Sequence, residues 1–303
     1  MKTLVFGGSG LLGSSIVRRL QKDNVDVISF SSSDCDLVNL SNPREVERVI
    51  NCIKPDTIYH CAGLVGGIGA NIANPYEFLM MNTHMAINVI TAVVNCDVEN
   101  FYYMSSSCAY PAICDQPMKE EYILTGSVEE TNGGYAVAKI VGMEATKAAR
   151  KKTGGNYNSF IPCNLYGEND DFSERGHVIS SLITKIREAK TQKNDSITIW
   201  GDGSPRREFL HVDDAADAIV YSSGKINSDY INIGSGYDIS ILELAKKILK
   251  LENAEDLSIK LDLSKPNGMM LKCLDISKIT KIGWKPQISL DEGISRILKS
   301  LDN

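Results

Sequence analysis

The sequence has no cluster of basic residues and no long apolar run. Its 32 lysines and arginines are outnumbered by 38 aspartates and glutamates, and both signs are dispersed along the chain. A protein that tracks a phosphate backbone needs a basic patch, so we expect no nucleic-acid partner. Eighteen uninterrupted apolar residues occur nowhere, and no charged segment followed by an apolar one opens the chain. We therefore expect a cytoplasmic protein without a membrane partner.

Metal-ligand spacing is also missing. The eight cysteines form no C-x-x-C pair. Scattered cysteines without a secretory segment argue against a disulfide framework, so most of them should be small buried hydrophobic side chains. The sequence has only four histidines, and they show no paired ligand spacing. We therefore expect no metal site.

Short β-rich runs alternate with longer amphipathic stretches through the first two thirds of the chain. The runs cover residues 2–6, 25–30, 56–61, 101–105 and 157–162. Such alternation predicts an α/β protein with a Rossmann-type, doubly wound parallel sheet that carries helices on both faces. With 303 residues, 43% of them hydrophobic, the chain is long enough for one large domain or two smaller ones.

A glycine loop, F-G-G-S-G-L-L-G, follows the first of these runs and leads into a helical pattern. Gly7, Gly10 and Gly13 are spaced by three residues. Glycine allows positive φ in the turn and lets the backbone approach a pyrophosphate at the helix N-terminus. In the order strand, turn, helix, the motif predicts a dinucleotide-binding site rather than a plain tight turn.

The pattern loosens after residue 165. The pieces there are a helix over 177–190, a strand ending at Trp200, a helix from Asp213 and a strand over 230–233. No linker rich in glycine, proline or serine separates two halves, so a second domain must be assembled from insertions. We predict a dinucleotide-binding domain over 1–165, with a return segment near 210–235, and a smaller, mostly C-terminal α/β substrate domain over 166–303.

Capping residues predict three helix starts. In a capping box, a serine and a glutamate three residues later exchange hydrogen bonds between side chain and backbone. The last stretch of the chain has two pairs with this spacing, Ser240 with Glu243 and Ser289 with Glu292. A third start is expected at 41–43, where S-N-P places a proline at the first turn of a helix.

The second strand is expected to end near Phe30, where NAD-binding proteins usually carry an acidic residue for the ribose hydroxyls. Ser31, Ser32 and Ser33 follow instead. Three hydroxyls without a nearby carboxylate can accept a 2′-phosphate, which favours NADPH over NADH, although the lysine or arginine that commonly pairs with that phosphate is missing. Asp36 then lies against the adenine edge or serves as a turn or helix-capping residue.

The stretch M-S-S-S-C-A-Y-P, residues 104–111, places three serines and a thiol at the expected carboxyl end of a buried strand. Ligands of open α/β sheets bind at such ends. Farther along the chain, Tyr135 and Lys139 are four residues apart on a predicted helix and share one face. A tyrosine titrates near pH 10, and a neighbouring lysine lowers that pKa and makes the phenol a better proton donor.

These motifs resemble those of the extended short-chain dehydrogenase/reductases, through G-x-x-G-x-x-G, the serine strand end and Y-x-x-x-K. Within that family, the resemblance is to the enzymes that make GDP-L-fucose by epimerising and then reducing a GDP-4-keto-6-deoxy sugar. It extends over essentially the whole chain. Further motifs that carry it are A-G-L-V-G-G-I-G-A-N, P-C-N-L-Y-G-E-N-D, G-H-V-I, I-W-G-D-G-S-P-R-R-E-F-L-H-V-D-D, S-K-P-N-G and L-D-I-S-K-I-T-K-I-G-W.

The resemblance implies an NADP-dependent oxidoreductase and isomerase, with roles for five residues. Ser106 matches the catalytic serine, Tyr135 the proton donor and Lys139 the residue that tunes it. Cys108 and His177 match the pair that exchanges protons at sugar C3 and C5, next to a 4-keto group that acidifies both C–H bonds. Hydride delivered to C4 then completes the product. The alternative for His177 is a surface histidine.

The resemblance also implies two binding sets. NADPH would be held by Gly7, Gly10, Leu11, Leu12, Gly13, Ser32, Asp36, Tyr135 and Lys139. The GDP-linked 4-keto sugar would be held by Asn164, His177, Lys185, Trp200, Arg207 and Lys265. Arg206 is an alternative to Arg207 at the diphosphate, where a guanidinium makes bidentate contacts. Asn164 is alternatively a buried amide that ties the strand end to a loop.

Two other functions are compatible with these residues. One is a C4 reductase that acts on a GDP-4-keto hexose or heptose and has no epimerase activity. The other is a dinucleotide-binding sensor without turnover. Helices over 76–96 and 133–152 match those that pair into a four-helix bundle in dimers of the family, so we expect a homodimer. The alternative is that their apolar stripes face only their own sheet.

Overall fold

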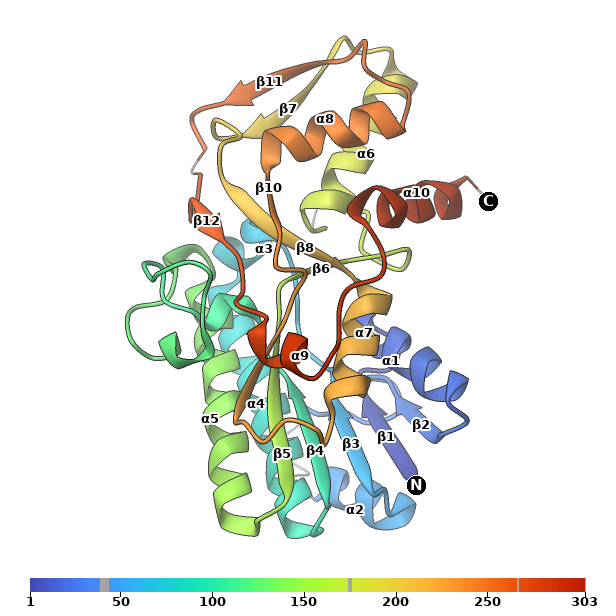
Figure 1. Cartoon of the computed structure of the whole chain (residues 1–303), viewed down its shortest axis with the longest axis vertical. Coiled ribbons are helices and arrows are strands. Elements are labelled where there is room, and N and C mark those ends of the chain that lie inside the picture. Colours follow the sequence, from blue (N-terminus) through green and yellow to red (C-terminus); the bar gives the residue numbers. More distant parts are fainter. Residues whose placement is uncertain (39–43, 174–175, 266, 303) are drawn as a thin grey trace.

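The computed structural model describes residues 1–38, 44–173, 176–265 and 267–302, and its larger unit is built on a six-stranded parallel sheet (Figure 1). The strand order is β2-β1-β3-β4-β5-β9. The strands are β1 (Lys2–Phe6), β2 (Asp26–Phe30), β3 (Thr57–His60), β4 (Asn100–Met104), β5 (Asn156–Pro162) and β9 (Tyr230–Ile233). The predicted parallel sheet is therefore confirmed, and all five expected runs form its strands.

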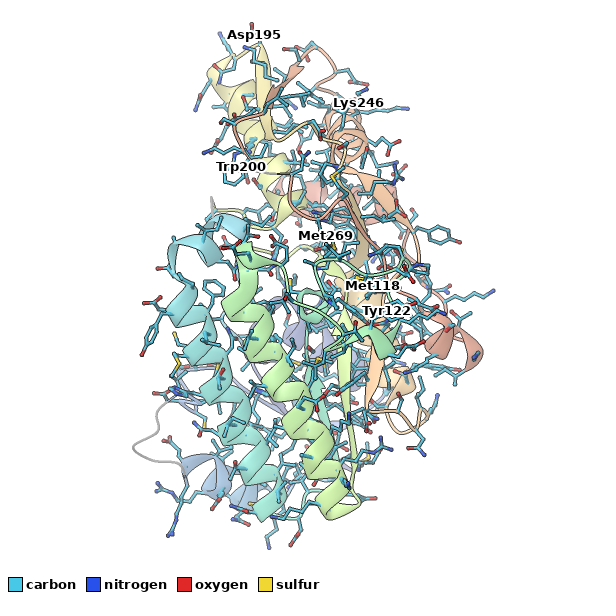
Figure 2. The ribbon with its side chains drawn as sticks, turned by 90° about the vertical axis from the view of Figure 1, so that its left-hand side faces the viewer. Met118, Tyr122, Asp195, Trp200, Lys246 and Met269 are labelled. Atoms are coloured by element: carbon cyan, nitrogen blue, oxygen red, sulfur yellow. The ribbon has the colours of Figure 1, made fainter. Side chains whose placement is uncertain are left out.

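Helices cover both faces of this sheet, as expected for a doubly wound fold. The helices of this unit are α1 (Leu11–Lys22), α2 (Glu45–Ile53), α3 (Ile68–Ala73), α4 (Pro75–Asn95), α5 (Gly133–Thr153), α7 (Val212–Ser222) and α9 (Ser277–Lys281). The two long helices α4 and α5 lie side by side (Figure 2), and α1 packs against α7. Three short 3₁₀ helices follow β4: η1 (Ser107–Ala109), η2 (Glu120–Tyr122) and η3 (Glu130–Asn132).

A smaller α/β unit lies beyond the carboxyl ends of these strands (Figure 1). Its strands are β6 (Asn164–Tyr166), β7 (Ser196–Trp200), β8 (Arg206–His211), β10 (Asp238–Ser240), β11 (Ser258–Asp262) and β12 (Leu271–Lys272). Its helices are α6 (Val178–Gln192), α8 (Ile241–Leu251) and α10 (Leu290–Leu301). Strand β8 pairs with β6, β10 and β12, whereas β7 pairs with β11. A separate hydrophobic cluster, which includes Ile183, Ile248 and Ile294, fills this unit.

The chain passes between the two units several times. After β6 and α6 in the smaller unit, α7 and β9 return to the large sheet. Near the C-terminus, Ile279 and Trp284 again belong to the hydrophobic core of the larger unit. The boundary between the units is therefore crossed by several segments, and side chains from distant parts of the sequence meet there.

The expected caps are confirmed in part. Ser240 and Glu243 form a complete capping box at the start of α8. At α10, Ser289 accepts a hydrogen bond from the Glu292 N–H, but the Glu292 carboxylate pairs with Arg296 one turn later. This second box is therefore only half formed, because a guanidinium competes for the carboxylate. The helix start expected at 41–43 lies outside the described residues.

By length and composition, α4 is the one helix among the described residues that is apolar enough to cross a membrane. Half of its most apolar window is buried inside the protein. Ala86, Val89 and Val93 are fully buried in the core of the larger unit. A core helix with this packing meets the same criteria without any membrane.

Candidate active site

The glycine loop between β1 and α1 is closely packed and suits a dinucleotide. Gly7 has φ +79°, and a Cβ there would lie 2.5 Å from the backbone nitrogen of Ala62. A Cβ on Gly13 would lie 2.1 Å from the Gly7 carbonyl oxygen. Gly10 caps α1 without any side chain, so the first N–H groups of the helix, at Leu11 and Leu12, have no side-chain cap. Such N–H groups are suited to a pyrophosphate.

The end of β2 differs from the sequence expectation. The N–H of Ser31 donates to the Asp34 carboxylate at 2.7 Å and its hydroxyl donates at 2.6 Å. These two hydrogen bonds lower the pKa of Asp34. The expectation of hydroxyls without a carboxylate is therefore wrong, because the turn folds Asp34 back onto the strand end. Ser32 is exposed beside it, and Asp36 accepts from the Val38 N–H, as a turn residue does.

Tyr135 and Lys139 lie on one face of α5, as their spacing predicts, and both are buried. The Lys139 ammonium donates to the carbonyl oxygen of Met104 at 2.9 Å, which ties α5 to the carboxyl end of β4. It also lies 5.6 Å from the centre of the Tyr135 ring. Burial lowers the pKa of Lys139 to about 8. The lysine is therefore close to losing its charge near neutral pH.

The pKa of Tyr135 is raised rather than lowered. Burial is the main cause, negative charge on Cys108 adds to it, and a hydrogen bond with Ser106 opposes both. The expected lowering by Lys139 does not prevail, because the phenol is buried. A phenol that stays protonated still has a proton to donate, and the hydrogen bond brings the Ser106 hydroxyl to its oxygen.

Cys108 lies in η1, shortly after the end of β4, and two side-chain donors reach its sulphur. Its N–H donates to the Ser106 hydroxyl at 3.2 Å. Its sulphur accepts from the Asn132 amide at 3.3 Å and from the Lys272 ammonium at 3.5 Å. Sequence reasoning missed both side chains. Asn132 precedes Tyr135 by three residues, a usable signal, but Lys272 comes from β12, more than 160 residues away in the chain.

The two arginines of R-R-E-F-L have different partners. Arg206 pairs with Asp238 and lies near Glu243, so its charge is balanced by carboxylates of the smaller unit. Arg207 donates to the Arg206 carbonyl at 2.9 Å, and burial lowers its pKa, against the opposing charges of Cys108 and Glu129. Of the two alternatives, Arg207 is the one whose charge acts on Cys108.

The remaining expected sugar-binding residues lie on the smaller unit or at its edge. Figure 2 shows Trp200 above the ends of α4 and α5. The Lys265 ammonium lies 5.3 Å from the centre of the Trp200 ring. Lys185 donates to the carbonyl of Thr198 on the same strand as Trp200, and burial lowers its pKa. Lys265 therefore lies by the Trp200 ring, and Lys185 is tied to the strand that ends at Trp200.

Asn164 at the start of β6 donates through its side chain to the carbonyl oxygen of Glu208 at 2.7 Å. This contact matches the structural alternative, a tie between the strand end and its neighbour. Glu208 itself is fully buried, and its carboxylate accepts from the N–H groups of Gly236 at 2.6 Å and Leu274 at 2.8 Å. Leu274 follows Lys272 by two residues, so these contacts hold β12 beside β8.

His177 is the residue immediately before α6. Its Nδ1 lies 3.1 Å from a carboxylate oxygen of Asp170, and this hydrogen bond raises its pKa despite burial. Within the described residues, no hydrogen bond joins His177 to Cys108. Cys108 follows β4 of the larger unit and His177 precedes α6 of the smaller unit, so the expected proton-exchanging pair is divided between the two units.

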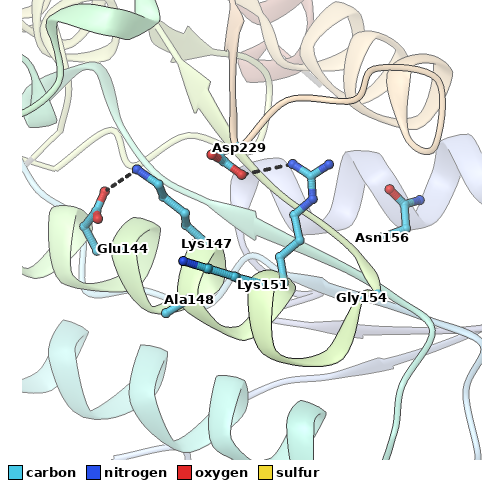
Figure 3. Close-up of a pocket in the computed structure, with 9 residues that line it drawn as sticks. Glu144, Lys147, Ala148, Lys151, Gly154, Asn156 and Asp229 are labelled. Carbon is cyan, nitrogen blue, oxygen red and sulfur yellow. Dashed lines mark hydrogen bonds and ion pairs between the residues drawn. The ribbon is translucent and has the colours of Figure 1, made fainter.

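A pocket of about 700 Å³ lies elsewhere, at the C-terminal end of α5 (Figure 3). Arg150, which lines it, pairs with Asp229 at 2.9 Å, and Lys147 is near Glu144 at 3.9 Å. Basic side chains in a last helical turn interact favourably with the unpaired carbonyl groups there. This pocket has none of the site residues named above.

The fold and the site together define a dinucleotide-dependent enzyme with a Ser-Tyr-Lys group at the carboxyl edge of a parallel sheet. The chain belongs to the NAD dependent epimerase/dehydratase family, whose model matches residues 3–234. It is 38% identical over 298 residues to a GDP-L-fucose synthase of Sinorhizobium fredii, covering 98% of this chain and 94% of the relative.

Two solved structures are similar over nearly the whole chain. One is a GDP-6-OMe-4-keto-L-xylo-heptose reductase from C. jejuni, with a TM-score of 0.90 and 26% identity, covering 99% of this chain and 97% of that one. The other is a GDP-L-fucose synthetase from Naegleria fowleri bound to NADP, with a TM-score of 0.89 and 25% identity, covering 100% and 93%.

Proposed function

We propose that this protein is an NADPH-dependent epimerase-reductase of a GDP-4-keto-6-deoxy sugar, as in GDP-L-fucose synthesis. The observation that carries the proposal is the arrangement at the end of β4, where Cys108 lies beside Ser106 and Tyr135. A reductase alone needs the phenol and the serine. The thiol beside them, which accepts hydrogen bonds from Lys272 and Asn132, adds a group that can exchange a proton with carbon.

The first step is epimerisation. The 4-keto group acidifies the C–H bonds at C3 and C5, and the Cys108 thiolate takes one of these protons, which leaves an enolate on the sugar and a thiol on the cysteine. His177 supplies a proton to the opposite face of the same carbon. In this proposal the sugar ring lies between Cys108 and His177, since the two side chains belong to different units. Lys272 and Asn132 hold the sulphur in place.

The second step is reduction at C4. When bound, NADPH supplies the hydride. Tyr135 donates its phenol proton to the C4 oxygen as the hydride arrives, so the ketone becomes an alcohol. Ser106 hydrogen-bonds the same oxygen, and Lys139 holds the carboxyl end of β4 against α5 beside the nicotinamide ribose.

The two ligands divide between the two units in this proposal. Residues 1–165, with the return near 210–235, hold NADPH through the glycine loop and the helix start after it. Residues 166–303 hold the GDP moiety, with Arg207 and Lys185 toward the diphosphate and Trp200 with Lys265 beside the base or sugar. A guanidinium suits a diphosphate better than an ammonium does, so Arg207 makes the larger contribution.

The test is an incubation with GDP-4-keto-6-deoxy-mannose in deuterium oxide, followed by mass spectrometry with and without NADPH. We expect one deuterium at each of C3 and C5 without NADPH, and a reduced sugar with it. Reduction without deuterium exchange identifies the C4 reductase alternative. Tight NADPH binding with neither reaction identifies the sensor alternative.

A pair of cysteine variants tests the role of the thiol. Cys108→Ser should lose deuterium exchange by at least about a hundredfold, since it removes the base. Cys52→Ser is the matched control, because Cys52 is exposed on α2 and lies outside the site. Equal exchange in both variants would exclude Cys108 as the base.

We also infer a cytoplasmic homodimer that pairs through α4 and α5. Ile87 on α4 and Val137 on α5 are 39% and 43% exposed, respectively. Light scattering on the purified protein should give the mass of a dimer. Val137→Glu should reduce it to that of a monomer, whereas Ile113→Glu, at a residue 93% exposed in a loop, should leave it unchanged. A wild-type monomer would contradict this inference.

A further inference from the structure

Asp170 is a buried carboxylate beside the histidine that the proposed epimerisation uses. Its side chain is 4% exposed, whereas that of His177 is 37% exposed. One carboxylate oxygen, Oδ1, lies 3.1 Å from His177 Nδ1 and also accepts from the Asp171 N–H at 2.9 Å. The other oxygen, Oδ2, is buried and has no hydrogen-bond partner among the described residues.

This environment is costly for an ionised carboxylate unless a positive charge compensates it. Burying a charge without partners is strongly unfavourable. One backbone N–H satisfies only part of Oδ1. Among the described residues, the imidazole is the other hydrogen-bond partner of this carboxylate, and as an imidazolium it supplies both a hydrogen bond and a positive charge. The pair is therefore most stable with His177 protonated.

The contact also decides which nitrogen carries which proton. A carboxylate only accepts hydrogen bonds, so Nδ1 must carry a hydrogen that points at Asp170. Any second proton resides on Nε2, on the other side of the ring. A histidine arranged this way can release the Nε2 proton to carbon while Asp170 keeps the ring orientation unchanged.

The two neighbouring aspartates of this loop, Asp170 and Asp171, make different side-chain contacts. Asp171, the next residue, accepts from the Ser173 N–H at 2.8 Å, which is a common turn contact. Asp170 accepts from the N–H of the next residue, Asp171, but its side chain is buried and reaches the histidine seven residues later. The charged groups that act on His177 in the described structure are Asp170 and Asp171, both negative.

We propose that Asp170 is a positioning residue that orients His177 and keeps it protonated as the proton donor in epimerisation. The inference rests on the proposed function, since it presupposes that His177 gives a proton to C3 or C5. It adds a carboxylate to the proposed site, on the smaller unit.

The test compares Asp170→Asn with Asp171→Asn, which removes a neighbouring negative charge but leaves the Nδ1 contact. In Asp170→Asn, deuterium exchange at C3 and C5 should fall roughly tenfold to a hundredfold. The alkaline limb of its pH profile should move to lower pH. Asp171→Asn should show a smaller shift. Reduction of a 4-keto sugar that is already epimerised should be unchanged in both variants.

A direct titration of His177 by NMR separates this inference from the proposed function. The His177 signal is assigned by its loss in His177→Gln. If Asp170→Asn leaves the titration of His177 where it is in the wild type, the inference is wrong, whatever the activity. If the wild type exchanges no deuterium but the titration shifts as expected, the pairing stands and the epimerase function fails. Equal loss of exchange and of thermal stability in Asp170→Asn, with an unshifted titration, would indicate a purely structural residue.

Discussion

Lys139→Met is expected to make the cofactor-free protein more stable and inactive. Lys139 is 4% exposed, and in the described structure its ammonium has one hydrogen bond, to the Met104 carbonyl. An ammonium has three hydrogens to donate. The folded state therefore holds a poorly solvated cation, which is tolerated because the proposed reaction needs it there. Methionine has a similar length and carries no charge.

The magnitude follows from the pKa. Burial lowers the pKa of Lys139 from 10.5 to about 8. At 1.36 kcal/mol for each pKa unit, the charged form is disfavoured in the folded state by about 3 kcal/mol. Loss of the hydrogen bond to Met104 lowers the free energy of unfolding by about 1 kcal/mol and so offsets part of this gain. The net gain for Lys139→Met at pH 7 is thus about 2 kcal/mol, or a rise of roughly 4 °C in melting temperature.

The gain should depend on pH in a defined direction. Between pH 8 and pH 10.5, the unfolded chain still binds a proton at residue 139 that the folded protein has released. The free energy of unfolding of the wild type therefore receives a contribution from Lys139 that rises with pH through this window. The advantage of Lys139→Met is complete below about pH 8 and should diminish toward pH 10.5.

The assay is urea unfolding of both proteins at several pH values, with NADPH oxidation measured in parallel. Lys147→Met is the matched control, since Lys147 lies on the same helix with its side chain 47% exposed. It should change the free energy of unfolding by less than about 0.5 kcal/mol. A Lys139→Met protein that is less stable than the wild type at pH 7, or a gain that is independent of pH, would refute the reasoning.

Three further outcomes are expected. Gly13→Ala should abolish NADP binding in calorimetry, because its Cβ would lie 2.1 Å from the Gly7 carbonyl oxygen, and unaltered affinity would exclude the proposed close packing of the loop. Tyr135→Phe should lower reduction by at least about a hundredfold while deuterium exchange continues, and intact reduction would remove the phenol from the mechanism. Lys272→Met should slow exchange by about tenfold or more and leave NADP affinity unchanged, since its ammonium is 3.5 Å from the Cys108 sulphur; exchange at the wild-type rate would show that the contact is dispensable.

Local patterns predicted the large sheet and the cofactor loop well. Each strand of the alternating pattern is short and apolar, and the loop after residue 6 must bend tightly, which glycine allows. The spacing of Tyr135 and Lys139 was sufficient to place them on one helix face. These features depend on residues that are close together in the chain, so the sequence is sufficient to predict them.

Predictions failed where a side chain's interactions depend on residues or burial that the motif does not contain. Glu292 has capping-box spacing, but Arg296 takes its carboxylate. The pKa of Tyr135 was expected to fall, but burial raises it, and burial is not visible in a motif. Asp34 was overlooked because its return to Ser31 depends on how the turn folds.

The sequence alone determined the class of fold, the tight glycine loop and the place of Tyr135 and Lys139 on one helix face, because period and spacing encode local geometry. Only the tertiary structure decided the surroundings of Cys108 and His177. Lys272 reaches the thiol from a strand of the smaller unit, and Asp170 turns inward to the imidazole. Such contacts arise when packing brings distant segments to one sheet edge, and no local pattern specifies that distance or the burial that comes with it.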